Sequence, residues 1–177
     1  DLRENIMYMI HEIIRSEMDQ YANEKLYPEE WTLDGLIADA EEIYAPPGRL
    51  HKAELEAMSR DELSETLIQI AEDNYRARED QYSASIMREL EKVVMLRVVD
   101  NKWMEHLDHM DMLRQGINLR AYGQRNPLVE YKLEGYNMFE EMIHQIQTDI
   151  AKLMYRVSVV TDEQRQLEDH LRSAQAS

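Results

Sequence analysis

The residues whose types and spacing could do chemistry lie at positions 105–111, in the run Glu-His-Leu-Asp-His-Met-Asp. On a helix, Glu105 lies four residues before His109 and His106 lies three before it, so either pair could share one face and bind a metal ion. Helical zinc proteases need two histidines four residues apart with a glutamate between them, and this run lacks that spacing. We therefore favour a solvated helix face over a metal-dependent hydrolase that uses these three side chains.

Residues 112–129 form a second stretch of interest, which is suited to contacts rather than to catalysis. They include no acidic residue, although the chain has 36 Asp plus Glu against 20 Lys plus Arg. Tyr122 lies near the centre of the stretch, among three arginines: Arg114, Arg120 and Arg125. Tyr and Arg combine a large contact area with hydrogen bonding. The stretch is either an ordinary helical turn whose arginines pair with nearby acids or a surface in which Tyr122 touches a partner.

Two helices are predicted to meet at this stretch. Gly116 can end the first, because glycine adopts the left-handed conformation of a helix C-terminus at little cost. Asn126 can cap the second with its side chain, and Pro127 then occupies the first helical position, where no N–H is needed. A connection of roughly ten residues favours antiparallel neighbours, so the sequence predicts a long helical hairpin.

Both predicted helices carry apolar residues at steps of three and four. Residues 93–99 are apolar nearly all round and should be buried on several sides. The first helix, from Ile86, continues with a stripe that comprises Leu96, Val99, Trp103, Leu107, Met110, Leu113 and Ile117. The second helix carries Met138, Phe139, Met142, Ile143, Ile146, Ile150, Leu153, Met154 and Val157. We expect these two stripes to face each other in the hairpin.

The first half of the chain is predicted to be a small acidic helical domain. Residues 27–80 hold 15 acidic and 5 basic residues, whereas the later part of the chain is nearly neutral. Apolar periodicity predicts helices over residues 2–26 and 31–44. Ser59 and Glu62 have the spacing of a capping box, in which each side chain satisfies a backbone N–H of the other. This box predicts the start of a further helix.

The composition favours an all-α fold, since the 177 residues include only 5 Gly and 4 Pro and are rich in helix formers. The absence of cysteine excludes disulfides and thiolate metal sites. The net charge of −16 argues against general nucleic-acid binding, which needs a basic surface. No apolar run approaches the length of about 18 residues that a bilayer span needs. The chain begins at Asp1 in a helical pattern, so we expect it to be a piece of a longer protein.

Three runs of residues resemble one protein family. They are Leu-Arg-Val-Val-Asp-Asn-Lys-Trp-Met-Glu-His-Leu at 96–107, Met-Asp-Met-Leu-Arg-Gln-Gly-Ile at 110–117 and Leu-Arg-Ala-Tyr-Gly-Gln-Arg-Asn-Pro at 119–127. They are similar to the SecA family, the motor ATPases of bacterial preprotein translocation. The likeness extends more loosely through Pro-Glu-Glu-Trp at 28–31 towards the first residue, and so covers roughly residues 1–157.

The resemblance implies a division into domains. Residues 1–82 look like the helical wing domain, and residues 83–157 look like the part of the helical scaffold domain that forms a two-helix finger. Residues 158–177 look like the start of the C-terminal linker. This division agrees with the small acidic helical domain and the long antiparallel hairpin that the residues themselves predict.

The resemblance also implies a role for the hairpin. In this family the finger inserts into the cytoplasmic mouth of the SecY channel, and a tyrosine at its tip contacts the translocating polypeptide. Tyr122 matches that tyrosine. By resemblance, Arg114, Ile117, Arg120 and Arg125 would help to hold the tip against the channel or the polypeptide. The same hairpin would restrain ATPase activity when channel and substrate are absent.

The implied partners are the SecY channel complex, an unfolded preprotein and the other domains of the parent motor, with a homodimer of the parent as a further option. The implied location is the bacterial cytoplasm and the cytoplasmic face of the cell membrane, to which the parent would bind peripherally. Neither nucleic acid nor a membrane-spanning segment is expected.

The family's nucleotide-binding domains have no counterpart in these 177 residues, so we expect no cofactor, metal or catalytic residue here. ATP and Mg would bind elsewhere in the parent, and this fragment alone should be inactive. The alternative function is that of a stand-alone helical adaptor. Such an adaptor would bind partner helices through a groove rich in methionine, of which the chain has 12.

Overall fold

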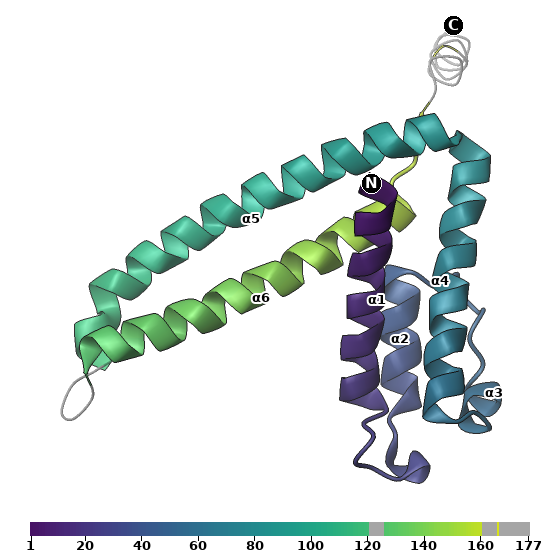
Figure 1. The fold of residues 1–177 in the computed structure, drawn as a ribbon, viewed down its shortest axis with the longest axis horizontal. Helices are drawn as coiled ribbons and strands as arrows, with labels where there is room; N and C mark the ends of the chain where they lie inside the picture. Colours follow the sequence, from purple (N-terminus) through teal and green to yellow (C-terminus); the bar gives the residue numbers. More distant parts are fainter. Residues whose placement is uncertain (121–125, 161–165, 167–177) are drawn as a thin grey trace, which may run out of the picture.

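The chain forms a bundle of helices and a long hairpin that projects from it (Figure 1). The computed structural model describes residues 1–120, 126–160 and 166. Within these residues all regular structure is helical, which confirms the predicted all-α fold. The elements are α1 (Leu2–Tyr21), the 3-10 helix η1 (Pro28–Glu30), α2 (Leu33–Ile43), α3 (Lys52–Glu56), α4 (Arg60–Tyr82), α5 (Ala84–Arg120) and α6 (Pro127–Arg156).

Helix α1 packs against both α2 and α4, and these three helices form the body of the bundle (Figure 1). Their inward faces are closed to solvent, since Ile10, Leu36 and Leu67 are all 0% exposed. The core continues into the base of the hairpin, where Ile150 and Met154 of α6 are also 0% exposed. The bundle therefore anchors the hairpin through apolar packing.

The capping box at the start of α4 is confirmed. Ser59 Oγ accepts a hydrogen bond from Glu62 N at 3.2 Å, and Glu62 Oε2 accepts one from Ser59 N at 2.8 Å. These two bonds satisfy backbone donors that the first helical turn leaves free. From this cap α4 continues to Tyr82, through a polar segment that buries little apolar area.

The first helix is shorter than its apolar periodicity predicts. It ends at Tyr21 and not near residue 26. The Asn23 side chain donates to the carbonyl of Asp19 at 3.0 Å and accepts from Lys25 N at 2.9 Å. These local bonds offer the backbone an alternative to the next helical turn, which explains why the helix ends early.

Helices α5 and α6 lie side by side and run antiparallel, as predicted (Figure 1). The prediction that Gly116 ends the first of them is wrong, because α5 continues to Arg120. Packing explains the difference. Leu113 and Ile117 flank the glycine and are only 4% and 7% exposed, and their burial outweighs the helix penalty of about 1 kcal/mol for glycine.

The predicted start of α6 is confirmed. Asn126 Oδ1 accepts a hydrogen bond from Leu128 N at 3.0 Å, and Pro127 is the first helical residue. Asn126 itself has an extended backbone, with φ −74° and ψ 119°, as an N-cap residue requires. The second helix of the hairpin therefore begins where its local signals place it.

The apolar residues of the hairpin are less buried than predicted. In segment 93–99, Val94 and Val98 are 7% and 6% exposed, but Val93 and Leu96 are each 58% exposed. A pair of helices can cover only one narrow face of each partner. A segment that is apolar all round therefore keeps its outer residues in solvent, and the prediction of burial on several sides is wrong for this chain.

The two predicted stripes face each other only in part. On α5, four residues that were expected between the helices are exposed: Leu96, Val99, Trp103 and Leu107. On α6, Met142 and Ile146 are buried, whereas Phe139 and Ile143 are 42% and 39% exposed. Leu113 and Ile117 of the predicted stripe are buried, and the seam of α5 is completed by Val94, Val98 and His106. The predicted stripe was drawn from apolar residues alone, so it left out His106. For this reason it followed only in part the face of α5 that is buried.

A single residue, Ser83, separates α4 from α5. The predicted division between a wing at 1–82 and a scaffold at 83–157 falls at this residue, and it stays a prediction because the apolar core includes side chains from both sides. Residues 158–177, predicted to begin a linker, lie for the most part outside the described residues. Among the described helices, none combines the length and the apolar character needed to cross a bilayer.

Candidate functional site

The predicted contact residues that the structure describes belong to the last turns of α5, whose C-terminal end lies away from the bundle (Figure 1). Tyr122 and Arg125 lie outside the described residues. Arg120 is the last residue of α5, and its side chain is likewise outside the description. Arg114 and Ile117 lie in the last turns of α5 and are described in full. The contact role of all five stays a prediction.

Arg114 extends along its own helix towards Asp111. Its Nη2 donates to Asp111 Oδ1 at 2.7 Å, and Gln115 Nε2 donates to Asp111 Oδ2 at 2.7 Å. The hydrogen bond from Arg114, followed by its charge, holds the pKa of Asp111 below its usual value. Because the Arg114 side chain is 70% exposed, water screens the pair. Arg114 thus pairs with a neighbouring acid, as in an ordinary helical turn, and stays accessible from solvent.

Ile117 lies in the buried seam rather than on the outer surface. It is 7% exposed, and Leu113, one turn earlier in α5, is 4% exposed. Helix α6 is the element that packs most extensively on α5, and Leu113 lines a groove together with Met138 of α6. In the described structure Ile117 therefore supports the end of the hairpin from inside, where it keeps the two helices together.

Exposed apolar side chains surround this end of the hairpin, and the sequence analysis did not single them out. On α5, Leu119 is 82% exposed and Met112 is 62% exposed. On α6 the group continues with Leu128, Val129, Leu133 and Tyr136. We call these six residues the distal apolar group. Their positions fall off the regular stripes, so periodicity gave no signal, but a cluster of exposed apolar residues is typical of a contact site.

Three rings connect the two helices halfway along the hairpin. The His106 ring centroid lies 5.6 Å from that of Trp103 on α5 and 5.8 Å from that of Phe139 on α6. Since Trp103 and Phe139 both contact His106, the exposed stripes of α5 and α6 lie on the same side of the hairpin. We call this side the apolar face; it comprises Leu96, Val99, Trp103, Leu107, Phe139 and Ile143, which are 39–58% exposed.

The three residues that were considered for a metal site, and for which a solvated helix face was favoured, lie along one groove of the hairpin. Glu105, His106 and His109 all line a groove of about 350 Å³ between the helices, and of the three His106 is buried, at 8% exposure. Lys102 Nζ lies 3.4 Å from Glu105 Oε2 and 3.5 Å from Asp149 Oδ2, and so brings a protein cation to these carboxylates. Within the part of the chain that the structure describes, no three His, Asp or Glu side chains come together to hold an ion.

The methionines do not line one open groove. Met18, Met87 and Met154 are among those that pack in the core, at 0–1% exposure. Only Met104 and Met112 are exposed, and the remaining methionines are buried or partly buried. The arrangement gives no support to a stand-alone adaptor that binds helices through a methionine-rich groove.

The fold and the site together define an all-α bundle that carries a projecting helical hairpin (Figure 1). The family described as SecA wing and scaffold domain matches residues 1–158. The chain therefore belongs to the SecA wing and scaffold family.

Several curated proteins are similar to this chain over most of its length. The protein translocase subunit SecA of Pelotomaculum thermopropionicum is 49% identical over 165 residues, which cover 93% of this chain and 19% of that protein. The protein of the same name from Desulforamulus reducens is 44% identical, with the same coverage. That of Desulforudis audaxviator is 42% identical over 98% of this chain and 20% of its own length. The chain thus spans about a fifth of the relatives that it matches.

Proposed function

We propose that this chain is the mechanical and regulatory module of an ATP-driven preprotein translocase, with residues 1–82 as wing and residues 83–157 as scaffold. In this proposal the end of the hairpin contacts the translocating polypeptide and the SecY channel. One observation carries the proposal: a hairpin anchored in a closed core presents a group of exposed apolar side chains at its far end.

The dimensions of the hairpin suit a mechanical role. Helix α5 has 37 residues, which at 1.5 Å per residue corresponds to about 55 Å. Its base is fixed by Met87, which is 0% exposed, and by packing of α6 on α1. A movement of the bundle or of anything bound to it would therefore reach the end of the hairpin as a displacement of the whole pair of helices.

The chemistry of the far end suits an unfolded polypeptide. Such a substrate exposes apolar side chains and unpaired backbone carbonyls of varied sequence. The distal apolar group offers sequence-tolerant apolar contact, while Arg114, Arg120 and Arg125 can donate to carbonyls. Tyr122 would add an aromatic ring with a hydroxyl at the turn itself. Ile117 would act from the seam, by holding the two helices in place.

The apolar face suits a second set of contacts, to the other four fifths of the parent protein. Trp103 and Leu96 are 46% and 58% exposed here, and a surface of this kind is normally covered. We propose that other domains of the parent cover it, and that the hairpin restrains ATPase activity through this contact. A homodimer of the parent that uses the same face is a further arrangement.

ATP and Mg would bind outside these 177 residues, in the nucleotide-binding domains of the parent. We propose that the parent works in the bacterial cytoplasm and at the cytoplasmic face of the membrane, bound to the SecY complex. The acidic surface, with a net charge of −16, makes nucleic acid an unsuitable partner.

The experiment is site-specific cross-linking in the intact parent, with a photo-reactive amino acid in place of Tyr122 and a preprotein stalled in the channel. We expect cross-links to the polypeptide or to SecY. A photo-reactive residue in place of Asp100, which is exposed in the middle of α5, is the matched control and should give neither. Absence of cross-links from position 122 while translocation proceeds would contradict the proposal.

A further inference from the structure

The corner between the bundle and the hairpin depends on one residue with an unusual backbone. Ser83 has φ 77° and ψ 152°, and it is the only non-glycine residue with positive φ in the described part of the chain. A positive φ is costly for a residue with a Cβ. Ser83 Oγ also accepts from Ile86 N at 3.4 Å, in the first turn of α5. The direction of the hairpin relative to the bundle therefore depends on the backbone of a single residue. Interactions between neighbouring helices must keep Ser83 in this costly conformation.

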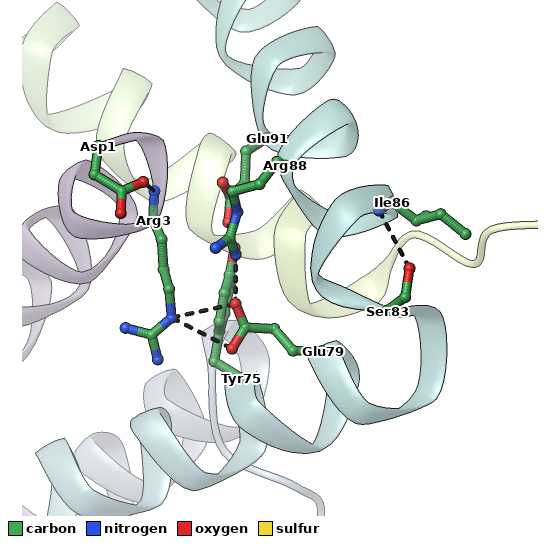
Figure 2. A network of polar contacts seen from close by, with 8 residues as sticks. All are labelled: Asp1, Arg3, Tyr75, Glu79, Ser83, Ile86, Arg88 and Glu91. Carbon is green, nitrogen blue, oxygen red and sulfur yellow. Dashed lines mark hydrogen bonds and ion pairs between the residues drawn. The ribbon is translucent and has the colours of Figure 1, made fainter.

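A cluster of polar side chains spans this corner (Figure 2). Its centre is Glu91 of α5, which is 0% exposed. Glu91 Oε1 accepts a hydrogen bond from Tyr75 OH of α4 at 2.5 Å and one from Arg88 Nη2 of α5 at 2.7 Å. Arg88 also donates to Glu79 of α4. The first turns of α5 are thus bound to the last turns of α4 by charged groups as well as by apolar packing.

The cluster extends to the first helix of the bundle. Arg3 Nε of α1 donates to both carboxylate oxygens of Glu79, at 3.2 and 3.3 Å. Two carboxylates and two guanidiniums are therefore linked in one chain of contacts, and Figure 2 shows Glu79 between Arg3 and Arg88. The two carboxylates are the less exposed members, with side chains 0% exposed for Glu91 and 15% for Glu79, whereas those of Arg88 and Arg3 are 29% and 32% exposed.

The hydrogen bonding of the cluster is incomplete. Glu91 Oε2 and Arg88 Nε are buried, and neither has a hydrogen-bond partner among the described residues. A buried ion pair repays the loss of hydration only when its remaining donors and acceptors are also satisfied. The two unsatisfied atoms therefore reduce what the closed arrangement gains over one in which the charged groups separate and regain water.

We propose that Arg3, Tyr75, Glu79, Arg88 and Glu91 form a releasable latch that sets the angle between α4 and α5. When the latch is closed, the hairpin keeps one direction relative to the bundle. When it opens, Ser83 is free to relax and the hairpin swings about the corner, while Met87 keeps the base of α5 in the core. This inference goes beyond the proposed function, since it concerns the motion of the hairpin and not what its end touches.

The test is a distance measurement by pulsed electron paramagnetic resonance in the intact protein that carries these residues. Spin-labelled amino acids replace Glu65 of α4 and Asp108 of α5, two exposed positions with no contact to the cluster. We expect one narrow distance for the native sequence. Glu91→Gln and Arg88→Gln should each add a second, broader population. Glu89→Gln removes the same charge from an exposed position of the same turn and should leave the single distance unchanged.

A narrow, unchanged distance in both cluster variants, with helix content preserved, would overturn the proposal and leave apolar packing as the cause of the angle. If Glu91→Gln prevents folding, Arg3→Gln decides the question. It removes only the outermost member and should still broaden the distance; an unchanged distance in that variant overturns the proposal as well. Because this readout needs neither channel nor preprotein, its result is independent of the cross-linking from position 122.

Discussion

The bundle and the hairpin are built from the same kinds of apolar residue at the same helical spacing, yet they bury them differently. In the bundle, Leu63 and Leu67 of α4 are 0% exposed. In the hairpin, Leu96 and Leu119 of α5 are 58% and 82% exposed. The difference lies in the number of neighbours, because the bundle surrounds each helix with several others, whereas the hairpin helices pack on the bundle at their base and otherwise mainly on each other. The base of the hairpin shares the core of the bundle, and the rest of the hairpin leaves apolar surface exposed.

The largest predicted effect is a difference in how much one leucine-to-alanine substitution lowers the free energy of unfolding in the bundle and in the hairpin. Leu67→Ala removes a fully buried side chain and should lower the free energy of unfolding by about 3 kcal/mol, through lost burial and the cavity left behind. The same change at Leu96, which is 58% exposed, should cost roughly 0.5 kcal/mol or less. Urea unfolding followed by circular dichroism measures both. Equal losses of free energy in the two variants would mean that the outer side of α5 is packed. The contrast between a buried bundle and an exposed hairpin would then be wrong.

A buried carboxylate gives the second test. Glu17 of α1 is 5% exposed, and its Oε2 accepts a hydrogen bond from Tyr44 OH at 2.7 Å. Burial, partly offset by that hydrogen bond and reinforced by the charge of Asp39, raises the pKa of Glu17 from 4.5 to about 8. The folded state therefore keeps a proton that the unfolded chain releases at lower pH. The stability of the bundle should fall as the pH rises from about 4.5 to about 8.

Glu17→Gln removes this titration and keeps an acceptor for Tyr44. We expect it to raise the free energy of unfolding at pH 8 by about 2 kcal/mol and to have little effect at pH 5. Unfolding curves at the two pH values measure the difference. Glu105→Gln, at an exposed site on α5, is the control and should not raise the free energy of unfolding at pH 8. A gain of equal size at both pH values would show that burial of the carboxylate is not the cause.

These differences explain how far the sequence could predict the structure. The cap at Asn126 and the capping box at Ser59 were found correctly, because both are formed by residues within one helical turn. Burial was predicted less well, because it depends on which helix lies opposite. Trp103 was expected in the seam and is 46% exposed, whereas His106 was expected in solvent and is 8% exposed. Glu17 gave no signal, since its partner Tyr44 is distant in sequence.

The candidate site shows the same limit. Tyr122 and the arginines were selected by residue type and by likeness to a family, and neither depends on packing. The distal apolar group was missed because exposure of Leu119 or Leu133 follows only from knowing which face of each helix meets the other. The corner cluster was missed for a related reason, since Arg3 and Glu79 come together only after α1 and α4 have packed.

The third prediction compares the two helix caps. Ser59→Ala should lower the free energy of unfolding of the bundle by about 1 kcal/mol. Helix α4 packs into the closed core, so the loss of its cap destabilises the whole cooperative unit. Asn126→Ala removes a similar hydrogen bond but should act only on the hairpin end. Hydrogen exchange measures this: the first amides of α6 should exchange about fivefold faster, a loss of roughly 1 kcal/mol, while those of α4 stay unchanged. Faster exchange throughout the bundle would mean that the two regions unfold together.

The smallest predicted effect comes from replacing two glycines of the hairpin by alanine, one with open space around it and one packed against the other helix. A Cβ added to Gly116 would meet no atom within 4 Å, so Gly116→Ala should stabilise α5 by roughly 0.5–1 kcal/mol, because alanine loses less backbone freedom in a helix. At Gly135 the added Cβ would lie 3.0 Å from Met110 Cε, so the same change in α6 must displace that side chain and should give no gain. Thermal unfolding of the two variants compares them directly. A loss at Gly116 would mean that the glycine takes a conformation that alanine cannot, and that α5 ends there in solution as its local sequence suggests.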